Sequence, residues 1–278
     1  MSEGTDYVAG FLREADRARY YATLFVPEKK RPAITALYAF AADVAAIRDR
    51  AREPAAGEIR LQWWVDALKG EGHGNVRANP LAAALLDAMA AHTLPAGPLL
   101  RLLAARRFDL YQDPMPDLET FEGYAGETVS VLFQLSAVVL LGEEPGTGDA
   151  AGHLGVAQAM TGHLRALGFN ASRGRIFLPM TVFTANGVTE AELLSGTESE
   201  GLFAARDQFA DLAAEHLAKA RAAIPALPAA ARPAFVGLPG IAAELSATRK
   251  APHPFAAPEG PGDFARLIGM ALFSLIGR

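Results

Sequence analysis

GVAQAMTGHLRALGFNASRGRIFLP, residues 155–179, combines a helical pattern with a cluster of arginines. We expect a helix over residues 149–169, because turn residues follow in NASRG. Small, polar and aromatic residues recur in this helix at three- and four-residue steps and therefore share one face: Gly155, Gln158, Gly162, Arg165 and Phe169. Two glycines on one face permit close approach either by a second helix or by a ligand, and the sequence leaves both open.

Three arginines lie at the end of this stretch, with no acid beside them. Arg165, Arg173 and Arg175 supply the charge, while the positions between them include Ala166 and Asn170. An arginine fork suits the oxygens of a phosphate or a carboxylate. It also suits the last carbonyls of a helix. The sequence thus indicates either an anion site or ordinary helix-end and surface contacts.

Helical patterns continue on both sides of this stretch, and no strand-like alternation persists. A proline suited to a first turn precedes one apolar helix, and turn residues separate the others. We expect helices over 27–51, 57–69, 79–92, 98–112, 117–141, 149–169, 200–223 and 262–276. The sequence therefore predicts one all-α domain over 1–278, in which the proline- and glycine-rich stretch 251–262 is a linker to a C-terminal helix.

Composition excludes several classes of protein. The 278 residues are 51% apolar and 21% charged, as in an ordinary globular chain. The net charge of −5 is spread along the sequence, which argues against nucleic-acid binding. The absence of cysteine excludes thiolate metal sites, and the histidines lack zinc-site spacing. The N-terminus does not resemble a signal peptide and the longest apolar stretch, 129–142, is too short to span a bilayer, so we expect a cytoplasmic protein.

Four segments of the chain, in order, resemble squalene/phytoene synthases: YYATLFVPEKKRPAITALYAFAADVAAIRD (20–49), IRLQWWVDAL (59–68), YAGETVSVLF (124–133) and the stretch 155–179. The resemblance implies an isoprenoid-synthase-like helical bundle around a central apolar cavity, lined by helices 27–50, 117–141 and 149–169. Enzymes of this family join two prenyl diphosphates, which magnesium holds against two aspartate motifs on facing helices.

The aspartate motifs are where this sequence departs from the family. The first falls on residues 45–49, where Ala45 and Ala46 replace acids and only Asp49 remains; the second has Ala166 and Asn170 in place of aspartates. Aspartates at i and i+4 lie about 40° apart on a helix, so a pair reaches one ion where a single acid does not complete the site. We therefore expect no metal, no cofactor and no catalytic residue; magnesium is needed only if the chain is an enzyme.

The loss of these acids resembles a branch of the family, the phytoene-synthase-like assembly factors of respiratory complex I. That branch implies a non-catalytic protein with complex I subunits as partners and a lipid or isoprenoid as the candidate ligand. It also implies peripheral membrane contact at the inner face of the respiratory membrane. The alternative is an active prenyl-diphosphate synthase, a prenyltransferase of the squalene/phytoene synthase type with altered metal ligands.

The resemblance also points to residues that would contact such a ligand. They lie on the arginine stretch and on the facing helix 117–141, and comprise Arg165, Arg173, Arg175, Gln158, Tyr124 and His163. Small residues in place of polar family residues, such as Ala159 and Gly162, are expected to leave the cavity open. A second DxxxD pair, Asp207 and Asp211, is more typical of a solvated helix face.

Overall fold

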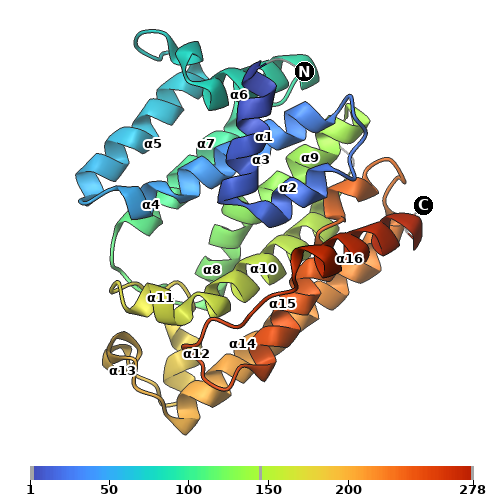
Figure 1. The fold of residues 1–278 in the computed structure, drawn as a ribbon. Helices are drawn as coiled ribbons and strands as arrows, with labels where there is room; N and C mark the ends of the chain where they lie inside the picture. Colours follow the sequence, from blue (N-terminus) through green and yellow to red (C-terminus); the bar gives the residue numbers. More distant parts are fainter. Residues whose placement is uncertain (1–2, 144–145, 277–278) are drawn as a thin grey trace.

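Helices are the regular secondary structure of the residues described here, and turns and loops connect them (Figure 1). The computed structural model describes residues 3–143 and 146–276, and no strand occurs in those ranges. The α-helices are α1 Glu3–Ala15, α2 Arg17–Thr23, α3 Arg31–Ala45, α4 Ile47–Arg50, α5 Pro54–Lys69, α6 Pro80–His92, α7 Ala96–Arg106, α8 Leu118–Ala125, α9 Val131–Leu141, α10 Gly148–Arg165, α11 Leu167–Ala171, α12 Met180–Ala185, α13 Glu190–Ser195, α14 Glu200–Ala223, α15 Leu238–Lys250 and α16 Asp263–Ile276. The prediction of an all-α fold is confirmed.

Shorter helical turns join these elements. They are η1 Val76–Ala78, η2 Arg107–Leu110, η4 Ile224–Ala226 and η5 Arg232–Phe235, all 3₁₀, and η3 Gly126–Ser130, a π-helical turn between α8 and α9. The helix expected from residue 27 begins instead at Arg31, with Pro32 in its first turn, because residues 27–30 form a turn. It is also interrupted at Ala46, where α4 begins a new turn.

The three helices expected to lie together do share one core. Leu37 on α3, Leu135 on α9 and Met160 on α10 are all buried in it. The hydroxyl of Ser136 donates to that of Tyr38 at 3.3 Å, which links α9 to α3. Burial of apolar surface among these helices is the main source of the fold's stability.

The longest apolar helix is the continuous run α8–η3–α9. Residues Leu118–Leu141 are long and apolar enough to cross a membrane by length and composition alone, but 72% of the apolar window is buried inside the protein. The run passes through the middle of the bundle in Figure 1 and supplies its core.

The stretch 251–262 lies against the body of the protein. Arg206 donates through Nη1 to the carbonyl of Ala251 at 2.9 Å. The carbonyl of Phe255 lies so close to Gly168 that a side chain there would collide with it. The stretch thus crosses the α11 end of the bundle before α16 begins, as the red ribbon of Figure 1 shows.

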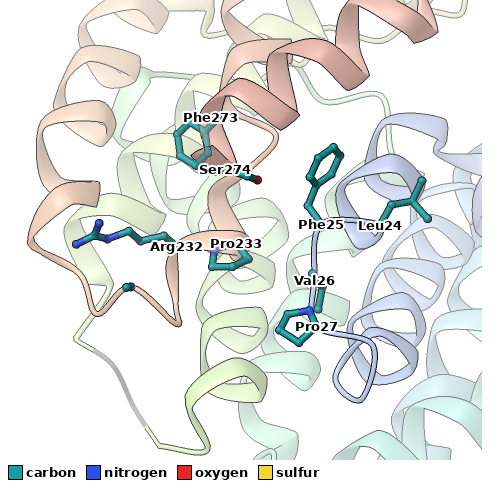
Figure 2. A pocket seen from close by; sticks show the side chains of 9 residues that line it. Leu24, Phe25, Val26, Pro27, Arg232, Pro233, Phe273 and Ser274 are labelled. Atoms are coloured by element: carbon teal, nitrogen blue, oxygen red, sulfur yellow. The ribbon is translucent and has the colours of Figure 1, made fainter. Parts of the chain in front are cut away.

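Two surface pockets lie at the edges of the bundle. One of about 780 Å³ lies among α1, α3 and α6. The other, of about 450 Å³, separates the α2–α3 turn from η5 and α16 (Figure 2). Neither is lined by α10, so neither is the central cavity that the resemblance implies. That cavity remains a prediction.

Candidate functional site

Asp49, on the first of the two segments aligned with the family motifs, contacts arginines that follow the second segment. Its Oδ1 accepts hydrogen bonds from Nη1 of Arg173 at 3.1 Å and from Nη1 of Arg175 at 3.3 Å. Nη2 of Arg175 also donates to the backbone carbonyl of Arg48 at 3.0 Å. The Arg48 guanidinium lies 3.6 Å from Oδ2 of Asp49. Three arginines therefore surround one carboxylate where α4 meets the turn after α11.

A buried polar network continues inward from this cluster. Arg106 at the end of α7 donates through Nη1 to Asp109 at 2.9 Å and to the Tyr124 hydroxyl at 2.8 Å. Tyr124 in turn donates to Asp109 Oδ1 at 2.6 Å. Burial raises the pKa of Tyr124, and the Arg106 pKa stays above its ordinary value because Tyr124 and Asp109 outweigh burial. Tyr124, expected to contact a ligand, has its hydroxyl engaged within the protein.

His163 lies behind this network, among aromatic rings. Its ring stacks on Phe177 with the centroids 4.9 Å apart, and the Arg48 guanidinium covers the same phenyl ring at 4.7 Å. Burial, with smaller effects of Arg48 and Arg106, lowers the pKa of His163 to about 3. The imidazole is therefore neutral near pH 7 and is not a general acid there.

Arg165 does not join the other two predicted arginines. Its Nη1 forms an ion pair with Glu244 of α15 at 3.1 Å. Glu244 also pairs with Arg266 of α16 at 2.8 Å. Arg165 thus ties α10 to the C-terminal helices, whereas Arg173 and Arg175 face Asp49. The last turn of α10 directs residue 165 away from the turn that follows α11.

The glycines of α10 differ in what surrounds them. A side chain at Gly155 would collide with the backbone of Ser130, which shows tight packing of α10 on η3. Gly162 is exposed and a Cβ there would meet nothing within 4 Å. Gln158 lies between them, and its Oε1 is buried without a hydrogen-bond partner among the described residues. Tight helix packing therefore holds at Gly155, and open space adjoins α10 at Gly162.

Phe169, which was expected to share a helix face with Gly155, Gln158, Gly162 and Arg165, lies at the surface. Phe169 is 50% exposed, and the guanidinium of Arg173 stacks over its ring at 3.9 Å. It does not fill space left by the missing acids.

The residues at the two motif positions do not fit magnesium. Ala45, Ala46 and Ala166 offer no side-chain oxygen, and Asn170 is buried. Asp43 is held by Trp64, whose Nε1 donates to it at 3.0 Å, and by Arg50. Within residues 3–143 and 146–276 no three acidic or histidine side chains are grouped to hold a metal ion. Magnesium needs several hard oxygen ligands in octahedral array, which this donor set does not supply.

The other acidic pair has ordinary partners. Asp207 pairs with Arg206 at 2.8 Å and Asp211 with Arg249 at 2.6 Å, and both carboxylates are exposed. The sequence reasoning missed Arg48, Arg106, Asp109 and Phe177. Two short runs, IRDR (47–50) and RRFD (106–109), could have indicated these residues. Each run places arginines and one aspartate within a predicted apolar helix, and such charged groups need partners when they are buried.

The cluster as a whole favours anions. Its arginines outnumber its carboxylates, and Arg173 is 46% exposed at its outer edge. The ligand-binding role of Arg165, Arg173, Arg175, Gln158, Tyr124 and His163 stays a prediction.

Comparison with known proteins identifies relatives of this chain. A model of the squalene/phytoene synthase family matches residues 12–260. NADH dehydrogenase (ubiquinone) complex I, assembly factor 6, of Bos taurus is 30% identical over 239 residues, covering 84% of this chain and 71% of that protein. The 15-cis-phytoene synthase of Synechocystis sp. is 28% identical over 194 residues, 65% of this chain and 57% of the enzyme.

A solved structure shares the fold. A dehydrosqualene synthase in complex with ligand superposes with a TM-score of 0.82 and 19% identity, covering 99% of this chain and 96% of that one. At this identity the likeness concerns the fold alone.

Proposed function

This chain belongs to the squalene/phytoene synthase family, and from that premise we propose that it is a non-catalytic member that assists the assembly of respiratory complex I. One observation carries the proposal. Of the aligned acidic positions only Asp49 bears a carboxylate, and Arg173 and Arg175 occupy it. A carboxylate bound to arginines is a poor ligand for a cation, because each arginine must first be displaced.

The relatives support the assembly role over the enzymatic one. The similarity to the assembly factor of Bos taurus extends over more of this chain than the similarity to the phytoene synthase of Synechocystis sp.. The named role of the former protein is complex I assembly, and complex I subunits are the partners that we propose here. The protein would then act at the membrane that contains complex I.

A lipid or isoprenoid ligand is a separate part of the proposal. Arg173 and Arg175, with their exposed edge, suit an anionic head group. Native mass spectrometry of the gently purified protein tests this part, since a bound lipid adds a discrete mass. Repeated absence of any adduct contradicts it and leaves the assembly role standing.

Gene deletion in the organism that encodes the protein tests the assembly role. We expect loss of complex I on native gels and loss of NADH–ubiquinone reductase activity, both restored by the wild-type gene. Restoration by a variant with Asp49→Asn is also expected, because no metal is held there. Intact complex I in the deletion strain, together with lost carotenoid or hopanoid synthesis, contradicts the proposal and favours the prenyltransferase.

A further inference from the structure

Two histidines from different helices meet where α10 packs on α14. Nδ1 of His153 lies 3.1 Å from Nδ1 of His216, and the two rings are inclined by 64° with their centroids 5.1 Å apart. The His216 side chain is only 12% exposed, and its Nε2 lies 3.3 Å from Oε1 of Glu122 on α8. These three residues connect three helices, and we call them the histidine joint.

The contacts of the histidine joint determine where its protons lie at neutral pH. A carboxylate beside Nε2 of His216 favours a proton on that nitrogen, so Nδ1 of His216 carries a lone pair. Nδ1 of His153 then donates to this lone pair, because two lone pairs facing each other at 3.1 Å would repel. A single proton between the two rings thus makes the hydrogen bond that joins α10 to α14.

The hydrogen bond tolerates one added proton but not two. Protonation of His153 at Nε2 leaves its Nδ1 donor in place. Protonation of His216 at Nδ1 removes the acceptor and brings two imidazolium ions into contact. Burial lowers the pKa of His216, with His153 and Lys219 adding to this effect and Glu122 opposing it. The closed joint therefore resists the second proton, whereas an opened joint accepts it at the ordinary histidine pKa of about 6.5.

The other charged groups near the joint do not neutralise a second imidazolium. On α14, Glu215 is already paired with Lys219 at 2.7 Å. On α10, Asp149 lies one turn before His153 and is exposed to water. The helix α15 forms its ion pairs outside the joint, Glu244 with Arg165 and Arg266, and Arg249 with Asp211. Within the described residues, two imidazolium ions would thus share the carboxylate of Glu122.

The histidine joint adjoins the segment that packs α10 onto the core. Ser130 of η3 donates to the carbonyl of Gly152 at 3.1 Å, one residue before His153. On α8, Tyr124 follows Glu122 by two residues and belongs to the buried network of Asp109. An opening of the joint would therefore act on the α8–η3 segment as well as on α10 and α14.

We propose that the histidine joint is a pH-sensitive switch in the packing of α10 against α14. Near neutral pH the shared proton holds the two helices together. In mildly acidic solution a second proton enters, the two rings separate and the N-terminal half of α10 loosens from α14. The inference needs neither complex I nor a ligand, so it can fail while the proposed function holds.

Hydrogen exchange of the full-length protein, resolved by peptide, tests the proposal. His163→Phe is the background for all measurements, because His163 titrates on the same helix. From about pH 6.5 to about pH 5.5 we expect protection of residues 148–157 and 210–218, corrected for the intrinsic exchange rate, to fall between about threefold and about tenfold, since uptake of one proton gives about tenfold per pH unit. The core helix α3 should keep its protection. His153→Asn with His216→Asn provides a hydrogen bond that does not titrate, so protection in this variant should not change.

His253→Asn is the matched control for the joint. Nδ1 of His253 also faces a carboxylate, 3.1 Å from Oε2 of Glu198, but no second histidine contacts it in the described part of the chain. This variant should keep the pH response of residues 148–157. Unchanged protection in the background protein overturns the proposal, as does an equal loss in α3, which would show global unfolding.

A second measurement decides the matter if the double asparagine variant does not fold. Titration of the Cε1 protons of His153 and His216 by NMR follows the two rings in the otherwise unmodified protein. Two titration steps separated by more than about one pH unit support the joint, because the rings then compete for protons. A single step near about pH 6.5 shows two independent histidines and overturns it.

Discussion

Arg175, in the turn after α11, contacts Asp49 on α4, with its Nη1 at 3.3 Å from the Oδ1 of that carboxylate. The two residues are 126 positions apart in the chain, and they lie in or beside the two segments, 45–49 and 166–170, that resemble the family's aspartate motifs. An internal ion pair thus occupies the carboxylate that the resemblance aligns with a magnesium ligand of the family. Arg173 adds a second contact to the same oxygen at 3.1 Å.

This pair gives the first prediction, which concerns stability. Asp49→Asn removes the negative charge that pairs with both Arg173 and Arg175. We expect the free energy of unfolding, measured in urea, to fall by about 1 kcal/mol, which is the upper end of the range for a half-exposed ion pair. Asp211→Asn serves as the control, since its ion pair with Arg249 is at the surface and is expected to contribute less than about 0.5 kcal/mol. Equal effects of the two substitutions would show that the Asp49 cluster has no special stabilising role.

The buried network beneath the cluster gives a larger effect. Asp109 is 2% exposed and accepts from both Arg106 and Tyr124. Asp109→Ala leaves the Arg106 charge buried without its partner, so we expect a loss of about 3–5 kcal/mol. Tyr124→Phe removes only a hydroxyl and is expected to cost about 1–3 kcal/mol. Urea unfolding followed by circular dichroism measures both, and an Asp109→Ala variant as stable as wild type contradicts the account of this network.

His163 makes a pH-dependent contribution. Its pKa is lowered to about 3 in the folded protein, mainly by burial, and lies near 6.5 in the unfolded chain. Between these values the unfolded chain binds the extra proton, so stability falls as the pH falls from about 6.5 toward 3. His163→Phe keeps a ring stacked on Phe177 but does not titrate. The free energy of unfolding of the variant should therefore decrease less over that range, and parallel pH curves for the two proteins would contradict the assignment.

Helix periodicity allowed much of the fold to be predicted, but not its interruptions. The pattern over 27–51 has no residue that breaks a helix near Ala46, and yet the chain starts a new turn there, at the point where Arg48 and Asp49 turn toward the arginines. The helix α15 was missed because Pro239 and Gly240 at its start resemble a turn. In the protein that proline occupies the first turn of a helix, where its missing N–H has no cost.

The site was predictable only where the family motif aligned its residues. The alignment marked Asp49 as the acid left at the first motif and Arg173 and Arg175 as candidate ligand-binding residues, and the structure brings the three into contact. Arg165 was grouped with them by its position in the sequence, but the final turn of α10 directs it to Glu244. Arg106 and Asp109 come from a segment with no motif, and only tertiary packing brings them to Tyr124. Periodicity specifies which face of a helix a residue occupies, but not which helix covers that face.

Magnesium gives a test of the site independent of activity. An ion that binds only the folded state at a hundredfold excess over its dissociation constant stabilises it by about 2.7 kcal/mol. We expect no rise in the melting temperature of the wild type with millimolar magnesium, with or without a non-hydrolysable prenyl diphosphate analogue. A variant with Ala45→Asp and Ala166→Asp should show a magnesium-dependent rise, because both positions are partly exposed and flank Asp49 and the arginines. A rise in the wild type with the analogue would indicate metal ligands that the described residues do not reveal.

The most direct test of the non-catalytic account is turnover. Purified protein is incubated with radiolabelled farnesyl diphosphate, and separately with geranylgeranyl diphosphate, in the presence of magnesium and a reduced nicotinamide cofactor, with a squalene/phytoene synthase as the positive control. Because Asp49 is occupied by Arg173 and Arg175, we predict no prenyl product and no diphosphate release above the level without protein. Formation of a joined prenyl product, lost on Asp49→Asn, would contradict the account and establish the chain as a prenyltransferase with altered ligands.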